Sequence, residues 1–155
     1  MVLALAGCTV TMKVVKSTSQ TWHGGAAGSG GGKNYLVTLT KPANTVVEIT
    51  QVWIGERDKG WLPRFQVLPQ TSDTADFHVA GKGVSEFTVK FGEVFPGQPG
   101  PRDAPRPVGV VPFDNPPNDL PDGFTHGAVI YYQTGKQKGT WIVSEFEVLP
   151  PLNYP

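Results

Sequence analysis

Histidines are the side chains that most often perform acid–base chemistry or bind transition metals, and this sequence holds only three. His23, His78 and His126 lie far apart, and none has a second histidine two or four residues away. That spacing is what brings two imidazoles to one face of a strand or helix around a metal. No Gly-x-Ser-x-Gly elbow occurs, which removes a common signature of serine hydrolases. The sequence predicts no metal centre, no cofactor and no enzymatic activity.

A hydrolase with a spatially assembled site stays open as an alternative. It requires a cleft in which a histidine meets a carboxylate. Paired carboxylates on facing positions would be needed for glycoside cleavage. Glu145 and Glu147 instead share one strand face and alternate with apolar Phe146 and Val148, which indicates a solvated surface.

The segment HGGAAGSGGGKN, residues 23–34, invites comparison with a phosphate-binding loop. Such a loop needs Gly-x-x-x-x-Gly-Lys-Ser/Thr, and the first and last fixed positions are Ala27 and Asn34 here. Lys33 also begins a strand-like run, whereas a phosphate loop leads into a helix. We interpret the segment as a connection of small residues that permits close approach of another backbone or a partner.

One loop gathers oxygen-bearing side chains. Calcium takes six to eight oxygen ligands, so a short loop could supply most of them. The candidates are Asp114, Asn115, Asn118, Asp119 and Asp122. The intervening prolines break the EF-hand spacing, so a series of Asx and proline turns is the competing and favoured interpretation.

Four tryptophans are many for 155 residues. Trp53 and Trp141 fall in the middle of strand-like runs, and we expect both to be buried. Trp22 and Trp61 adjoin loops and are candidates for stacking on sugars or contacting a partner. The full set of candidate contact residues comprises Trp22, His23, Trp61, Lys136 and Lys138.

The elements that must position these residues are strands. Nineteen glycines and fifteen prolines suit short strands joined by turns, and no run of ten residues has a helical period. Residues 8–155 are expected to form one domain, an all-β, antiparallel, immunoglobulin-like β-sandwich of about seven to nine strands. A barrel is the alternative architecture.

Alternating apolar residues locate the individual strands. A first strand is expected over residues 10–15, and residues 33–40 and 45–55 are expected to form the first hairpin around a Lys-Pro-Ala-Asn turn. A second hairpin is expected from residues 128–134 and 140–149. Pro63 indicates an edge strand or a bulge, and the final residues PPLNYP are expected to lie extended outside any ladder.

Charge and composition restrict the partners. Thirteen basic and thirteen acidic residues cancel, so no basic cluster is evident and nucleic acid is excluded as a partner. Residues 96–122 hold nine prolines and almost no periodicity, which predicts a long proline-rich loop. Long loops of this kind often carry function.

The opening MVLALAGC ends in small residues before the single cysteine, as the end of a secretory signal does. Leu5-Ala6-Gly7-Cys8 resembles the lipobox of bacterial lipoproteins. The resemblance implies cleavage before Cys8 and lipid on its sulfur and freed amine, which anchors the protein to a membrane. Residues 1–7 would then be the end of a longer signal, since no Lys or Arg precedes Lys13.

The whole chain also resembles small lipoproteins of the Bacteroidota, in WHGG, GSGGGKNY and the ending LPPLNYP. The resemblance implies the outer membrane, and the lack of acidic residues in TVTMKVVK favours its periplasmic face over the cell surface. We therefore expect a lipid-anchored, non-enzymatic envelope protein that acts as an accessory to another envelope protein. A carbohydrate-binding module that uses surface tryptophans to hold a glycan is the alternative.

Overall fold

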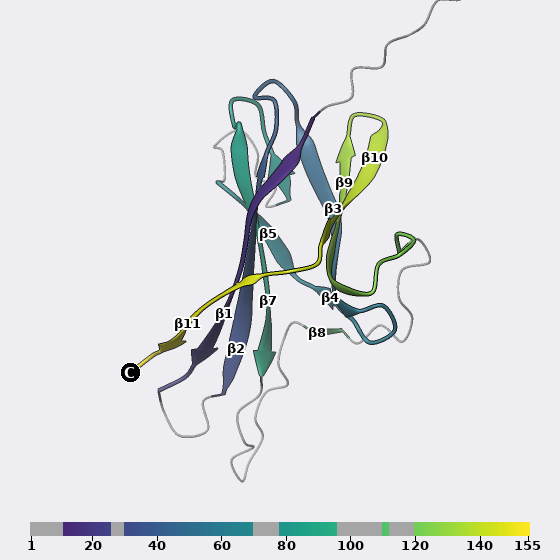
Figure 1. Cartoon of the computed structure of the whole chain (residues 1–155). Coiled ribbons are helices and arrows are strands. Elements are labelled where there is room, and N and C mark those ends of the chain that lie inside the picture. Colours follow the sequence, from purple (N-terminus) through teal and green to yellow (C-terminus); the bar gives the residue numbers. More distant parts are fainter. Residues whose placement is uncertain (1–10, 26–29, 70–77, 96–109, 112–119) are drawn as a thin grey trace, which may run out of the picture.

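The computed structural model describes residues 11–25, 30–69, 78–95, 110–111 and 120–155. Within these residues every regular element is a strand. Two sheets face each other, and the predicted all-β sandwich is confirmed (Figure 1). The immunoglobulin-like assignment stays a prediction.

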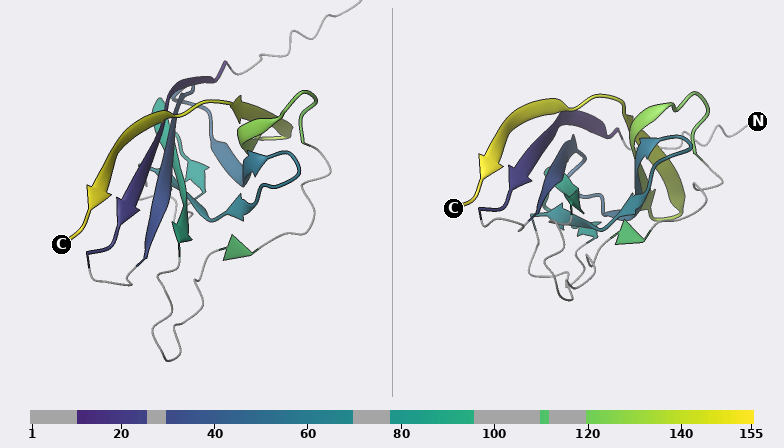
Figure 2. Two further views of the ribbon diagram at one scale, coloured as in Figure 1. Left: turned by 60° about the horizontal axis from the view of Figure 1, so that its bottom comes forward. Right: turned by 90° about the horizontal axis from the view of Figure 1, so that it is seen from below.

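Sheet A has five strands, and all of its neighbouring pairs except β11–β1 are antiparallel. In spatial order they are β11 (Glu147–Asn153), β1 (Lys13–His23), β2 (Gly31–Thr40), β7 (Glu86–Phe95) and β5 (Phe65–Leu68). Figure 2 shows β11 at the outer edge of this sheet, next to β1.

Sheet B has four antiparallel strands, and a two-stranded ribbon accompanies it. In spatial order the sheet holds β10 (Gln137–Val143), β9 (His126–Thr134), β3 (Val47–Glu56) and β6 (Val79–Ala80). The ribbon pairs β4 (Leu62–Pro63) with β8 (Val110–Val111).

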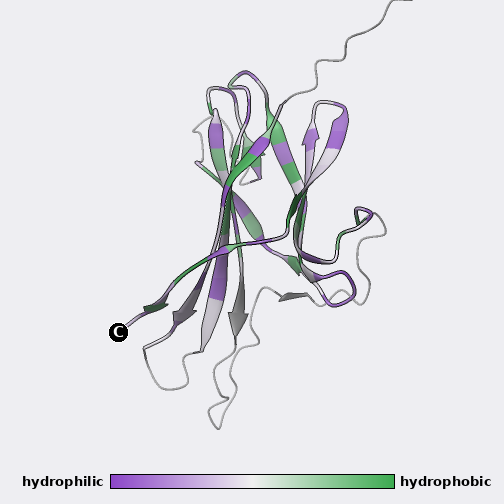
Figure 3. Cartoon of the chain, viewed as in Figure 1, coloured by the Kyte–Doolittle hydropathy of each residue, from purple (hydrophilic) through white to green (hydrophobic). Residues whose placement is uncertain are grey.

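Alternation along the strands builds the interior between the sheets (Figure 3). Val37 and Leu39 of β2 and Phe87 and Val89 of β7 are buried there, since successive side chains of a strand point to opposite faces. Sheet B contributes Val52 of β3 and its neighbours on the same face. Fully burying one such side chain contributes about 1.5–3 kcal/mol, so this layer is the main source of stability.

The outer face of sheet B is covered too. Trp53, Val129 and Tyr131 point away from the main interior and pack with Leu120, near the end of the proline-rich segment, and with Phe124, just after it. This outer core explains the uninterrupted apolar runs at residues 52–54 of β3 and 128–132 of β9, because a strand segment covered on both faces needs apolar residues at every position. Trp53, 1% exposed, is buried as expected, whereas Trp141 is half-buried against Tyr132.

The expected first hairpin is wrong. β2 pairs with β1 and β7, and β3 pairs with β9 and β6, so the turn after Thr40 carries the chain from one sheet to the other. The alternation of apolar residues identified both strands but did not indicate which strands they pair with. The first strand also lies later than expected, at Lys13–His23, and its first pairing partner is β2.

The C-terminal half contains one confirmed element and one correction. β9 and β10 form the expected hairpin around residues 135–136. The second run of that hairpin ends at Val143, and the chain then crosses to sheet A as β11, parallel to β1. Pro150 and Pro151 therefore lie within a strand, although prolines were expected to keep the tail out of a ladder. They occupy an edge strand, where a missing N–H is tolerated.

Two further observations concern Pro63 and the membrane. Pro63 ends the short β4, and β5 directly after it is the edge strand of sheet A, as its sequence predicted. In the part of the chain that the structure describes, no helix has the length and apolar character needed to span a bilayer.

Candidate functional site

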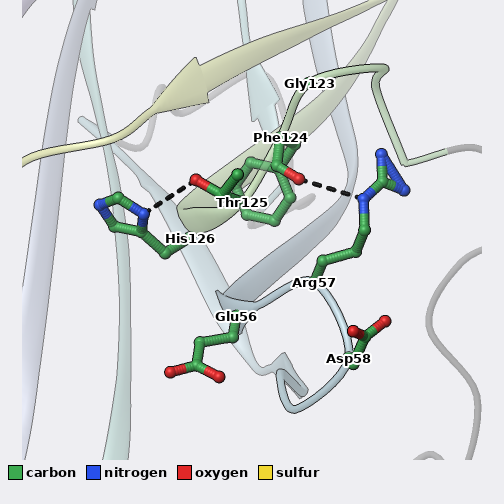
Figure 4. A pocket seen from close by; sticks show the side chains of 7 residues that line it. All are labelled: Glu56, Arg57, Asp58, Gly123, Phe124, Thr125 and His126. Carbon is green, nitrogen blue, oxygen red and sulfur yellow. Dashed lines mark hydrogen bonds between the residues drawn. The ribbon is translucent and has the colours of Figure 1, made fainter.

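A hollow of about 620 Å³ lies between two turns beside the outer core. Residues 56–58, at the end of β3, form one wall, and residues 123–126, at the start of β9, form the other (Figure 4). β3 and β9 are neighbours in sheet B, and Glu56 and His126 are cross-strand partners. The pairing of these two strands therefore brings together two turns that are far apart in the sequence.

Glycines shape the first turn. Gly55 has a φ of +122°, which L side chains rarely adopt, and a Cβ there would come within 2.7 Å of the Gly60 Cα. A Cβ on Gly60 would collide with the Trp53 ring. The turn between them closes with a hydrogen bond from the Lys59 N–H to the Glu56 carbonyl oxygen, 3.2 Å. The GERDKG stretch is thus a tight turn pressed onto a buried tryptophan.

The second turn is held by its own apolar residue. Phe124 is 3% exposed and packs in the outer core with Trp53. Its N–H donates to the Pro121 carbonyl oxygen at 3.2 Å, and Gly123 supplies the positive φ of +79° that the turn requires. Burial of Phe124 therefore fixes where Thr125 and His126 emerge.

Arg57 fastens the two turns together. Its Nε donates to the Phe124 carbonyl oxygen at 3.1 Å and its Nη2 to the Pro121 carbonyl oxygen at 2.7 Å. Its backbone N–H donates to the Thr125 carbonyl oxygen at 2.9 Å. A guanidinium has a rigid fork of donors, so two such bonds define direction as well as distance. Figure 4 shows the Arg57 side chain extending to the Phe124 carbonyl oxygen, with the Glu56 and Asp58 side chains on either side of Arg57 along the same turn.

His126 shares the hollow with Glu56, the juxtaposition that the hydrolase alternative requires. Its Nδ1 shares a hydrogen bond of 3.0 Å with the Thr125 hydroxyl. A hydroxyl bound to an imidazole is the first half of a nucleophile–base arrangement, and a group that orients the other ring nitrogen is the second half. Within the described residues no hydrogen bond joins Glu56 to His126, so the second half is not formed there.

The groups of the hollow that are available to a ligand are mainly carboxylates. Glu56, Asp58 and His126 are all exposed, and Arg57 already binds backbone carbonyls. Over the described residues, no group of three or more His, Cys, Asp or Glu side chains is placed to hold a metal ion. The arrangement can receive a cationic group or hydroxyls through Glu56 and Asp58.

The predicted contact residues lie at separate places. Trp22 and His23 end β1, where the Trp22 ring meets the Tyr154 ring edge-on at 6.2 Å. The Tyr154 N–H donates to the His23 carbonyl oxygen at 3.0 Å. A Cβ on Gly25 would collide with the Tyr154 and Pro155 backbones, so this part of the glycine-rich segment does permit a close approach.

The remaining contact candidates are distant from Trp22. Trp61 is half-buried against the main interior, and its indole nitrogen is buried. Lys136 lies in the β9–β10 turn and Lys138 in β10, and both are exposed. Trp22 and His23 thus lie together in sheet A, and Lys136 and Lys138 lie together at a hairpin of sheet B. The two pairs do not share a surface element.

Several candidates lie outside the described residues. They are the lipidation candidate Cys8 and the calcium candidates Asp114, Asn115, Asn118 and Asp119. Most of the proline-rich loop of residues 96–122 is outside as well. Asp122 is described, and its side chain is exposed in the turn before Gly123.

Sequence reasoning missed the hollow of Figure 4. An arginine between two carboxylates in the glycine-flanked stretch GERDKG was a usable signal. From the sequence, His126 was considered as a metal ligand, and the strand that pairs with its own strand was not known. Pairing of β3 with β9 is the missing information, because only that pairing places Glu56 opposite His126.

Comparison of this chain with protein-family models, with curated proteins and with solved structures finds no match. The function must therefore be argued from the fold and the surface alone.

Proposed function

We propose that the chain is a non-enzymatic binding module of a bacterial cell envelope, an accessory to another envelope protein. In this proposal lipid on Cys8 holds it at the outer membrane, on the periplasmic side. The observation that carries the binding role is the hollow of Figure 4, whose two turns are fastened together by Arg57.

Pre-organisation supports a binding role. Each of the two turns is anchored on a buried aromatic ring, Trp53 beneath Gly60 and Phe124 in the outer core. A surface whose backbone is already fixed loses little conformational entropy when a partner binds. Loops on a rigid sheet scaffold are also where binding residues concentrate.

Charge suggests the kind of partner. Glu56 and Asp58 are exposed at the hollow, and within the described residues neither is paired with a cation. Complementary charge steers encounter and selects partners. The partner surface that fits this hollow presents a lysine or arginine.

Binding is favoured over catalysis by the state of His126. Its Nδ1 is engaged by Thr125, and no carboxylate orients its Nε2 within the described residues. The Thr–His pair therefore lacks the third group that activates a nucleophile. A hydrolase would need that geometry to form on substrate binding.

The binding role can be tested by capture from crosslinked envelope membranes with the full chain. We expect Glu56→Gln/Asp58→Asn to lower recovery of the partner at least several-fold, because the charge of the hollow is lost at nearly constant shape. Glu48→Gln/Glu86→Gln is the matched control, since both residues are exposed and lie elsewhere. Equal recovery with both double variants would refute the assignment of the hollow.

The anchor is tested separately. Cys8→Ser should move the protein from the membrane to the soluble fraction, because the sulfur that receives lipid is lost. Mass spectrometry of the native protein should find acyl chains on Cys8. A membrane-bound Cys8→Ser protein, or an unmodified thiol in the native protein, would contradict the anchor and leave the binding role untouched.

A carbohydrate-binding module is the second candidate, and Trp22 is the observation that favours it. The Trp22 ring lies against Tyr154, which is 53% exposed, so two aromatic rings are available at the end of sheet A. Aromatic faces suit sugar rings. Trp22→Ala should abolish binding of neutral glycans, whereas Trp61→Phe should not; neutral-glycan binding that survives Trp22→Ala would refute this candidate.

A further inference from the structure

A second hollow, of about 290 Å³, lies over the edge of sheet A where β5 begins. Its polar lining comes from Arg64, just before β5, and from side chains on β5, β7 and β2. Gln66 is the cross-strand partner of Lys90, and Asn34 is the partner of Gly92. Three neighbouring strands therefore present one small polar surface.

This surface is cationic. Arg64 and Lys90 are exposed, and no Asp or Glu is among the described residues that line the hollow. Within the described part of the chain, neither side chain makes an ion pair. The net charge of the whole protein is zero, so two unpaired cations at one hollow are a local concentration of charge. In contrast to Arg57, these cations are available to a ligand.

Gly92 keeps the hollow open. A Cβ at this position would come within 3.1 Å of the Asn34 Oδ1 and within 2.8 Å of the Lys33 carbonyl oxygen. The Asn34 amide therefore lies close to Gly92, in space that a side chain would contest. Asn34 and Gln66 are half-buried, and their amides offer both donors and acceptors beside the two cations.

An adjoining hollow of about 560 Å³ shares Arg64, Phe65 and Gln66 with the first. In it the rings of Phe65 and His78 lie with centroids 4.4 Å apart. Phe65 alternates with Gln66 along β5 and packs against the main interior, so this aromatic surface lies around the edge of the sheet from the polar one. Binding sites for small ligands typically combine an apolar wall with a few well-placed polar groups. The two hollows together have that composition.

We propose that the hollows around Arg64 and Lys90 form a binding site for a carboxylate-bearing sugar, such as a uronate residue of an acidic glycan. The guanidinium of Arg64 matches a carboxylate in a bidentate manner, and the Lys90 ammonium adds a second positive charge. The amides of Asn34 and Gln66 receive the hydroxyls, and the Phe65–His78 surface around the sheet edge receives the apolar face of an adjoining sugar ring. An acidic peptide has the carboxylates and can pair with the amides through its backbone, but an acidic peptide such as polyglutamate lacks a saturated ring to lie on the Phe65–His78 surface.

This site is independent of Cys8, of the hollow at Glu56 and of Trp22. The proposal for the Arg64/Lys90 site can therefore be refuted while the proposed function stands. The proposed function can likewise be refuted while the site stands. The site adds a ligand class to the protein and does not depend on a protein partner.

The test is calorimetric titration of the full chain with a galacturonate oligomer, a neutral galactose oligomer of equal length and hexaglutamate. We expect binding of the galacturonate oligomer alone. Arg64→Gln/Lys90→Gln should weaken that binding at least about tenfold, because two charge-assisted contacts are lost. Lys136→Gln/Lys138→Gln removes the same charge elsewhere and should leave affinity unchanged, and thermal melting should confirm that both variants fold.

Each other outcome overturns the proposal. If the wild-type protein does not bind the galacturonate oligomer, the site does not exist. Equal loss in both double variants means that binding follows net charge alone. Equal or tighter binding of hexaglutamate shows that the surface takes acidic peptides, and equal binding of the neutral oligomer shows that the cations play no part.

Discussion

The two ends of β3 are each fastened by a cation that donates to backbone carbonyls. Before β3, the Lys41 Nζ donates to the carbonyl oxygens of Thr45 at 2.6 Å, Gly81 at 2.9 Å and Pro42 at 3.4 Å. After β3, Arg57 binds the carbonyl oxygens of Phe124 and Pro121. Lys41 is 4% exposed, whereas Arg57 is half-buried.

The difference shows that hydrogen bonds from a cation to backbone carbonyls can either stabilise the fold or shape a binding surface. At the Lys41 end all three N–H donors of the ammonium group bind carbonyl oxygens of the protein. No donor is left for a ligand, so this end of β3 is closed to binding. At the Arg57 end the cation holds turns whose carboxylates, Glu56 and Asp58, stay exposed beside a hollow. The hydrogen bonds of the buried Lys41 contribute to stability, whereas those of the half-buried Arg57 shape a surface that can bind a partner.

Lys41→Met should have the largest effect on stability. The variant removes the ammonium donor from three carbonyl oxygens, of which that of Pro42 keeps the Thr45 N–H, and we expect the free energy of unfolding to fall by about 3 kcal/mol. Urea denaturation followed by tryptophan fluorescence measures it. Lys82→Met, an exposed neighbour of Gly81, is the control and should change stability little. If the two variants lose the same amount, the Lys41 end is not closed by this cation.

Arg57→Met should have a smaller and more local effect. We expect a loss of about 2 kcal/mol, because two charge-assisted bonds disappear at a site that water can reach. Hydrogen exchange should accelerate at the Phe124 amide and stay slow at Val37 in the main interior. Lys59→Met in the same turn is the control. Acceleration throughout the protein would mean that the Arg57 end is as integral to the fold as the Lys41 end.

The pH dependence of the Lys41 end should be the smallest effect. Desolvation by burial lowers the pKa of Lys41 from its ordinary value of 10.5. Between the lowered pKa and 10.5 the unfolded chain binds more protons than the folded chain, so this residue makes stability rise with pH in that window. The difference in unfolding free energy between wild type and Lys41→Met should therefore grow toward pH 10.5. A difference that shrinks over that window would contradict the lowered pKa.

Much of the fold could be predicted from local pattern. Alternation identified β2, β3 and β9, and the run that contains Pro63 includes the edge strand β5. Pairing could not be predicted in the same way, because β2 and β3 are adjacent in sequence and lie in different sheets. The parallel β11 was missed for a related reason, since proline propensities describe central strands better than edges.

The candidate sites depend almost wholly on long-range pairing. His126 was noticed as a histidine, but Glu56 became its neighbour only through the β3–β9 register. Arg64 directly precedes the edge strand β5 and Lys90 lies in the strand beside it, and their common surface follows from β5 pairing with β7. Exposed charged residues carry no hydrophobic period, so nothing in the local sequence indicated these groupings.

The parallel pairing of β1 with β11 has a mechanical consequence. The strands are bonded from Thr18 and Glu147 to His23 and Asn153. A pull on the chain ahead of β1, opposed by a pull on the chain after β11, runs along both strands and loads their hydrogen bonds in shear. Bonds loaded in shear must break together, whereas bonds in a peeled hairpin break one by one. Single-molecule stretching should then give one abrupt rupture, and a gradual low-force extension would speak against it.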